Sequence, residues 1–229
     1  MIDLMIINYN MPEAVTEIMD SIHSKVHHRW IVVDNGSDIV APHPKTSIFV
    51  LENKQVMGGF LAGLDLVKSD FFWDFSTSMS AFKYEADPIK DMLSAFSNED
   101  VVAVFPAFTS GVKAPTHKVF NKQDTHFHQT PIGGFDGMWR TEWINGHIDH
   151  AFTSWGVDID LGFRAHFEGK TMLVDNCVTC DLVERRGYPD RRKVSEEENN
   201  RVENDRMNAI LSEKYGANWR ETDWLRGAL

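Results

Sequence analysis

Short apolar runs, each followed by polar or turn-forming residues, recur along the first half of the chain. Residues 1–7 form a nearly continuous apolar run that only Asp3 interrupts, which is typical of a strand buried on both faces. The same pattern predicts further strands at residues 30–33, 47–51, 70–75, 101–105 and 171–174. Such strands usually belong to a parallel sheet that is covered by helices on both faces.

Segments with helical spacing of apolar residues lie between these runs. Val15, Ile18, Met19 and Ile22 recur at helical intervals after Asn10, which we interpret as the cap of this helix. Further helices are predicted at residues 60–67, 88–96, 138–144 and 155–167. The alternation of strands and helices with short links predicts an α/β fold with a mainly parallel sheet, resembling a Rossmann fold.

Polar residues follow three of the predicted strands. They are Asn8-Tyr9, Asp34-Asn35 and Ser76-Thr77-Ser78. The carboxyl ends of parallel strands lie along one edge of a sheet, and ligands of such sheets bind there. This edge is therefore the predicted binding site.

Two carboxylates stand at the start of the helix predicted at residues 155–167. Asp158 lies three residues before Leu161 and six before Arg164, so these side chains share one helical face. The positive end of a helix keeps a first-turn carboxylate ionised, as a general base requires. The same pattern, with Asp160 beside it, also suits a solvated first turn that merely stabilises the helix.

Composition limits the class of protein. The 229 residues are 42% hydrophobic and carry a formal net charge of −11, which disfavours nucleic acid or anionic membrane as a general partner. We expect one large domain at residues 1–183, followed by a charged helical extension at residues 184–229 packed on it. No apolar run approaches the length of a membrane span and no signal peptide is recognised, so a cytoplasmic location is expected.

Cysteine and histidine residues give no diagnostic metal spacing. Cys177 and Cys180 are too few for a disulfide framework, and in a strand they would face opposite sides, so we interpret them as ordinary thiols. His126 and His128 would share one face of a strand, and we interpret them as surface or acceptor-pocket residues.

Four stretches, taken together, match a known pattern. They are Ile6-Ile7-Asn8-Tyr9-Asn10, Val32-Val33-Asp34-Asn35-Gly36-Ser37, the region from Glu52-Asn53 to Gly63, and the block from Gly133-Gly134 to Asp158-Ile159-Asp160-Leu161. In this order and spacing the chain resembles family 2 glycosyltransferases, which have the GT-A fold. The resemblance covers about residues 1 to 180, and each motif is weak when taken alone.

The resemblance implies an inverting hexosyl- or pentosyltransferase that moves a sugar from a nucleotide-diphosphate donor, favoured as a UDP sugar, to the hydroxyl of a saccharide or other acceptor. Asp158 would be the general base. The donor would be bound by Asn8, Tyr9, Asp34, Asn53, Gly58, Gly59, Ser76 and Ser78. The acceptor or sugar would be bound by Gly133, Gly134, Trp155 and Asp160.

The chain departs from the family at the metal site. Ser76-Thr77-Ser78 stands where the family has an Asp-x-Asp-like motif, and Cys180 stands where it often has a histidine. Hydroxyl groups are poor ligands for Mn or Mg, which prefer anionic oxygen. A further departure is Val157, where the family usually has glutamate before the catalytic aspartate. The resemblance thus leaves dependence on a divalent metal open.

Several interpretations remain open at this stage. The enzyme would work without metal if a basic cluster bound the diphosphate, and Arg185, Arg186, Arg191 and Arg192 are the candidates. Alternatively, Asp74 would supply the missing carboxylate and hold a metal. The chain would otherwise bind a nucleotide sugar without turnover, or glycosylate a modified base in DNA, as viral relatives of the fold do. The acidic net charge argues against the DNA acceptor.

Overall fold

The computed structural model describes residues 1–110, 115–183 and 196–225. Within them, nine strands form one sheet with the order β3-β2-β1-β4-β8-β6-β9-β5, and β7 also pairs with β9. The strands are β1 (Ile2–Asn8), β2 (His28–Asn35), β3 (Thr46–Val50), β4 (Phe71–Ser76), β5 (Lys83–Tyr84), β6 (Val101–Ser110), β7 (Phe127–Thr130), β8 (Met138–Arg140) and β9 (Thr171–Asp181). The predicted α/β class with a mainly parallel sheet is confirmed.

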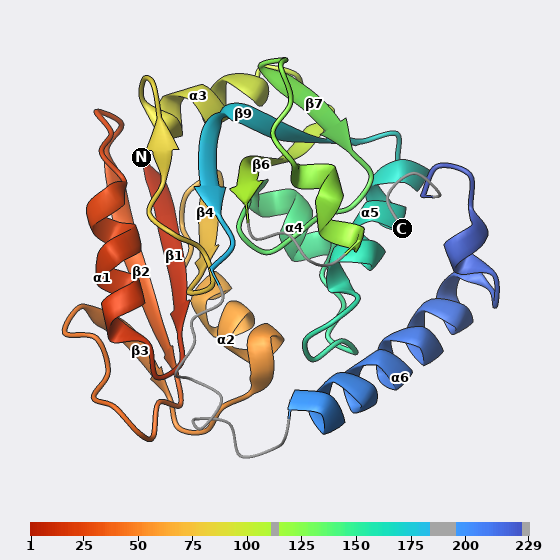
Figure 1. The fold of residues 1–229 in the computed structure, drawn as a ribbon, viewed down its shortest axis with the longest axis horizontal. Coiled ribbons are helices and arrows are strands. Elements are labelled where there is room, and N and C mark those ends of the chain that lie inside the picture. Colours follow the sequence, from red (N-terminus) through yellow and green to blue (C-terminus); the bar gives the residue numbers. More distant parts are fainter. Residues whose placement is uncertain (111–114, 184–195, 226–229) are drawn as a thin grey trace.

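Helices flank this sheet (Figure 1). They are α1 (Pro12–Ser21), α2 (Gln55–Leu64), α3 (Pro88–Ala95), α4 (Thr141–His147), α5 (Val157–Phe167) and α6 (Glu196–Tyr215), with short 3-10 turns at Pro115–Phe120 and Trp219–Glu221. Asp87 caps α3 as its Asp-Pro start implies, because its side chain accepts a hydrogen bond from the Lys90 N–H. No helix in these described ranges is long and apolar enough to cross a membrane.

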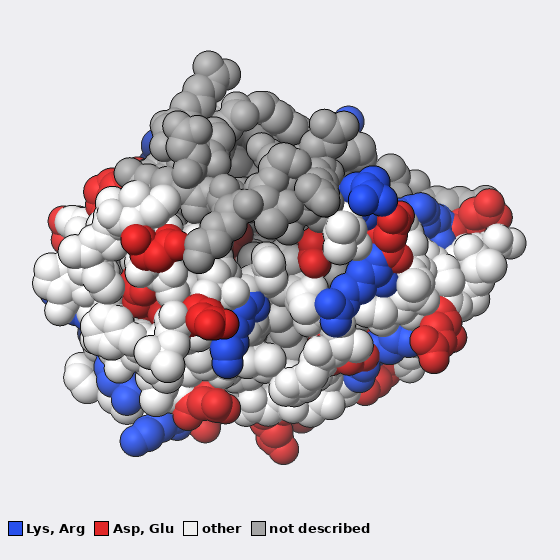
Figure 2. Space-filling model, turned by 90° about the horizontal axis from the view of Figure 1, so that it is seen from below, with Lys and Arg blue, Asp and Glu red and all other residues white. Residues whose placement is uncertain are grey.

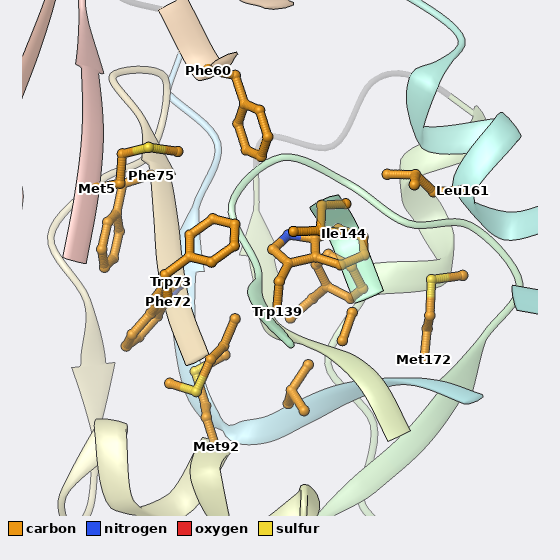
Figure 3. Packing of buried hydrophobic residues seen from close by; sticks show 14 of the residues in the cluster. Met5, Phe60, Phe72, Trp73, Phe75, Met92, Trp139, Ile144, Leu161 and Met172 are labelled. Carbon is orange, nitrogen blue, oxygen red and sulfur yellow. The ribbon is translucent and has the colours of Figure 1, made fainter. Parts of the chain in front are cut away.

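One predicted helix is wrong at its start. Met138, Trp139 and Arg140 form strand β8, which lies antiparallel between β4 and β6, and the helix begins only at Thr141. A segment of three residues is too short for its apolar pattern to distinguish a strand from a helix. Trp139 is 1% exposed and packs among Phe72, Leu161 and Met172 in the core shown in Figure 3. The strand thus carries the central aromatic residue between β4 and α5.

The start of α1 also differs from the sequence interpretation. Met11, not Asn10, is the N-cap of this helix and makes no side-chain cap hydrogen bond. The Met11 N–H instead donates to Oδ1 of Asn8, at 2.9 Å. Asn10 has a left-handed φ of 57°, which asparagine tolerates better than most residues.

Helix α2 contains the glycines that the sequence placed in a turn near the ligand. The helix begins at Gln55, so Gly58 and Gly59 lie inside it. A Cβ at Gly59 would lie 2.8 Å from Ile7 Cγ2, and one at Gly63 would overlap Met5 Sδ. Gly59 and Gly63 therefore let α2 pack closely on β1 and β2. Gly59, which the sequence analysis predicted near the donor, thus contributes to this packing.

Candidate functional site

The carboxyl ends of β1 and β2 share a buried hydrogen-bond network. Asn8 Nδ2 donates to Asp34 Oδ2 at 2.8 Å, and Ser37 donates to Asp34 through both its N–H (2.9 Å) and its hydroxyl (2.8 Å). Asp34 is 2% exposed and Asn8 is fully buried. Asn8 and Asp34, both predicted to bind the donor, therefore hold the loop after β2 in place through these hydrogen bonds.

Asn10 orders the same loop from the β1 side. Its Oδ1 accepts hydrogen bonds from the N–H groups of Asp38, Ile39 and Val40, at 3.1, 3.0 and 3.4 Å. Tyr9, between Asn8 and Asn10, is half-buried at this strand end. Asn8 and Asp34 are buried, whereas the predicted donor-binding residue Tyr9 is partly exposed.

A surface pocket of about 470 Å³ opens where β3 ends and α2 begins. Its lining includes Glu52, Lys54 and Gly58. Asn35 holds the adjoining segment, because its Nδ2 donates to the Gln55 carbonyl at 2.7 Å and to Asn53 Oδ1 at 3.3 Å. Gln55 has a left-handed φ of 60°, so the backbone at the start of α2 is strained. Gly58 and Asn53 thus stay at the predicted ligand edge.

The end of β4 holds two carboxyl groups, only one of which the sequence interpretation included. Asp74 is 1% exposed and accepts hydrogen bonds from the Asp136 N–H (2.9 Å), the Gly137 N–H (3.3 Å) and Trp139 Nε1 (3.1 Å). Asp136, which the sequence analysis missed, accepts a hydrogen bond from the Ser76 N–H at 2.5 Å. Its φ of 91° is unusual for a residue with a side chain and marks a strained position beside the strand end.

This arrangement does not fit a divalent metal at Asp74. Both of its carboxylate oxygens already accept hydrogen bonds, and burial together with the adjacent Asp136 carboxyl raises the pKa of Asp74 well above its usual value. The hydroxyls of Ser76 and Ser78 lie 2.6 Å apart and are neutral groups. Mn and Mg bind anionic oxygen, so Asp74 and these two serines make a poor set of metal ligands.

The Asp136 carboxyl predicts a pH-dependent stability. Burial raises its pKa to about 6, although its hydrogen bonds with Ser76 act in the opposite direction. Its stabilising contribution is therefore complete below the unfolded pKa and is lost as the pH rises through about 6. A shift of about two units corresponds to roughly 3 kcal/mol as an upper value. Asp136→Asn keeps an oxygen for the Ser76 N–H, so it should raise stability in urea at pH 8 and not at pH 4.5. An equal effect at both pH values would contradict this assignment.

Helix α5 places Asp158 beside the turn that precedes β8. Gly156 is the N-cap residue with a φ of 91°, so α5 starts at Val157, two residues later than expected. Asp158 is half-buried in the first turn, and its carbonyl accepts a hydrogen bond from the Gly133 N–H at 3.1 Å. Gly133, predicted on the acceptor side, therefore lies beside Asp158. Gly134 follows it in the same turn, and Trp155 is 37% exposed just before the helix.

Gly162, in the middle of α5, lets the helix lie close to the turn that contains Pro131. A Cβ at Gly162 would overlap the carbonyl oxygen of Pro131. Gly162→Ala should therefore lower the free energy of unfolding by about 1–3 kcal/mol through overpacking, and disturb the Gly133–Asp158 contact. Chemical denaturation checks the stability. Gly146→Ala in α4 is the control, because a Cβ there meets no atom within 4 Å. Equal losses in both variants would contradict the role of Gly162.

Asp160 points into the interface between α5 and α6. It is fully buried and contacts Arg164 Nε (2.8 Å), Lys214 Nζ and the Tyr215 hydroxyl (2.6 Å). Burial, together with the hydrogen bond to Asp160, raises the pKa of Tyr215, which therefore stays protonated and donates. Asp160, which the sequence analysis predicted on the acceptor side, thus anchors α6 to α5 in this structure.

Helix α6 also contacts the loop that leads into α5 through the Glu203 side chain. Glu203 is 6% exposed and accepts hydrogen bonds from the Thr153 hydroxyl, the shorter at 2.8 Å. The Thr153 carbonyl in turn accepts a hydrogen bond from the Met57 N–H in α2, at 3.0 Å. These contacts join α6 to α2 through the loop that leads into α5.

Figure 2 shows the molecule from the side to which β1 points, with acidic and basic side chains interspersed over that face. Arg185, Arg186, Arg191 and Arg192 lie outside the described residues. Val183 is the last described residue before them, and its N–H donates to the Ser78 carbonyl at 2.8 Å. The chain therefore passes the end of β4 immediately before the basic cluster begins.

Comparison with solved structures identifies the fold. The crystal structure of GalNAc-T7 with UDP, GalNAc and Mn2+ matches with a TM-score of 0.62 and 11% identity, covering 80% of this chain and 44% of that one. S. aureus TarS 1-349 in complex with UDP matches with a TM-score of 0.55 and 12% identity, covering 92% of this chain and 72% of that one. This chain has a GT-A-like fold. It spans less than half the length of the GalNAc-T7 chain.

Sequence comparisons add no family assignment. No protein-family model matches the chain, and no curated protein matches its sequence. At 11% and 12% identity the two structures establish the fold alone, so function has to be argued from the site.

Proposed function

We propose that this chain is an inverting glycosyltransferase of the family 2 type, using a nucleotide-diphosphate sugar. The observation that supports this proposal is the connection between the start of α2, which Asn35 at the end of β2 holds, and the segment that leads into α5. The Met57–Thr153 hydrogen bond joins α2 to the loop before α5, and the Gly133–Asp158 hydrogen bond joins the turn before β8 to the first turn of α5. Both matched structures contain UDP, which favours a UDP sugar as the donor.

In this proposal the donor lies across the ends of β1, β2 and β4. Tyr9 and Asn53 would contact the nucleoside, within the frame that Asn8, Asp34 and Asn35 hold in place. Ser76 and Ser78 would donate hydroxyl hydrogen bonds to the diphosphate. The basic cluster that follows Val183 would neutralise the leaving group, since arginine side chains bind phosphate oxygens in pairs of hydrogen bonds.

Asp158 would act as the general base. Its carboxylate accepts the proton of the acceptor hydroxyl while the oxygen forms a bond to the anomeric carbon. The bond between that carbon and the diphosphate oxygen breaks, and its electron pair leaves with the nucleoside diphosphate. The positive end of α5 favours the ionised carboxylate before the reaction. Gly133, Gly134 and Trp155, which lie close to Asp158 in the structure or the sequence, would contact the acceptor.

Product analysis tests this proposal. The chain is incubated in EDTA with UDP, GDP and dTDP sugars and with simple saccharide acceptors, and release of nucleoside diphosphate is followed. NMR of the product should show an anomeric configuration opposite to that of the donor. Retention of configuration would contradict the inverting mechanism. Activity that requires Mn or Mg would contradict the metal-free site.

A further inference from the structure

Strand β9 changes its neighbour at a bulge far from the β1–β2 edge. Its first part pairs with β7, where Asp175 lies opposite Phe127, and its second part pairs with β5, where Val178 lies opposite Tyr84. On the β6 side the register jumps from Pro106↔Asp175 to Ala107↔Thr179. A bulge of this kind redirects side chains and is a built feature of the fold rather than a defect.

The bulge brings three metal-ligating side chains together. They are His126, which immediately precedes β7, and Asp175 and Cys177 on β9. One imidazole nitrogen, one carboxylate oxygen and the thiol sulfur all lie within 4.8 Å of one another. His126 Nε2 is 3.5 Å from Asp175 Oδ1. Ligand atoms around one zinc ion lie about 2.0–2.3 Å from the metal, so small side-chain movements would bring all three into its shell.

Asp175 is buried with an unsatisfied oxygen. The side chain is fully buried, and its Oδ1 accepts a hydrogen bond from the Cys177 N–H at 2.9 Å. Its Oδ2 is also buried, and it has no hydrogen-bond partner among the described residues. Burying a carboxylate oxygen without a partner is costly, and a cation bound by both oxygens of Asp175 would remove this cost.

The backbone around the three ligands is held in place. Asn176 donates its N–H to the His126 carbonyl at 2.8 Å, and its Oδ1 accepts the Gln123 N–H at 2.7 Å. The His126 ring stacks on Phe127 with its centroid at 4.0 Å. His126, Asn176 and Cys177 all line a surface pocket of about 530 Å³. Solvent and a metal ion would therefore reach the ligands through this pocket.

We propose that His126, Asp175 and Cys177 form a binding site for a zinc-class divalent ion, with a fourth position open to this pocket. A mixed set of imidazole, carboxylate and thiolate ligands suits zinc better than Mg or Mn, which prefer oxygen. The site lies on β9 and the start of β7, not at the β1, β2 and β4 strand ends. It does not rest on the proposed transferase activity.

Cobalt substitution tests the proposal directly, because the chain has two cysteines, Cys177 and Cys180. The full chain is treated with EDTA, dialysed and titrated with Co²⁺ and then Zn²⁺. We expect thiolate-to-cobalt charge-transfer absorption that saturates at one equivalent and disappears when Zn²⁺ displaces Co²⁺. No such absorption, or saturation far above one equivalent, would overturn the proposal.

Two cysteine variants identify the ligand. Cys177→Ser should abolish the charge-transfer band and weaken Zn²⁺ binding by at least about 100-fold, since even groups outside the first coordination shell are worth about 10–100-fold. Cys180→Ala should keep the band, because Cys180 is fully buried. Circular dichroism confirms that each variant is folded, and His126→Ala, at a 49% exposed side chain, serves as a second ligand deletion that leaves the core intact. A band that survives Cys177→Ser would refute the assignment.

Discussion

Asp158→Asn should lower turnover by about 10²–10⁴-fold, the usual contribution of a general base, while leaving donor affinity within a few fold. The change removes the proton acceptor but keeps the size of the side chain. The backbone carbonyl of residue 158 still accepts the Gly133 N–H, so α5 should keep its position. Steady-state kinetics and calorimetric donor titration of the same preparation measure the two quantities.

The matched control is Glu13→Gln, which removes an exposed carboxylate from the first turn of α1. It should leave turnover unchanged. If the Asp158 and Glu13 variants have equal, normal turnover, Asp158 is not the base. If wild-type protein binds a nucleotide sugar without any turnover, the chain is a binding protein and the proposed reaction is wrong.

Asp160→Ala should lower the free energy of unfolding by about 3 kcal/mol, because removal of one member of a buried ion pair leaves the partner charges uncompensated. The estimate is at the lower end because the Arg164 and Lys214 side chains are 28% and 24% exposed. For a chain of this size the melting temperature should fall by about 6–12 °C. Urea unfolding and thermal melts measure both effects.

Asp149→Asn provides the comparison, because Asp149 contacts the same two cations from a more exposed position. Its carboxylate lies 2.7 Å from Lys214 Nζ and 3.8 Å from Arg164, and its side chain is 25% exposed. Exposed ion pairs contribute little, so the loss should stay below about 1 kcal/mol. Equal losses at Asp149 and Asp160 would contradict the view that Asp160 is the buried anchor of α6.

Buried strands of the parallel part of the sheet were predictable because their apolar runs are continuous. Strand β1 extends from Ile2 to Asn8, close to the predicted range of 1–7. Strand β9 reaches Asp181, although the prediction stopped at Val174, because Asp175 and Asn176 lie at a bulge that no local pattern reveals. Strand β8 was missed because three residues between β4 and β6 depend on tertiary pairing, not on periodicity.

The position of the polar residues at one edge of the sheet was predictable, but the contacts of each side chain were not. Asp34 stands at the end of a buried strand, where a ligand-binding residue is expected. Asn8 and Ser37 donate hydrogen bonds to its carboxylate. Asn8 belongs to a different segment of the chain, so its contact with Asp34 could not be predicted from the sequence. Asp160 looked equivalent to Asp158, and only the docking of Lys214 and Tyr215 shows that it faces inward. Asp136 carried no sequence signal beyond a glycine-rich turn.

Calorimetric titration of the wild-type chain in EDTA with UDP, and then with UDP sugars, tests the central claim most directly. We predict saturable binding of one equivalent that persists without divalent metal and is weakened by Tyr9→Ala. No detectable heat with UDP, GDP, dTDP or their sugars, either in EDTA or with Mn or Mg, would contradict the donor site at the ends of β1, β2 and β4.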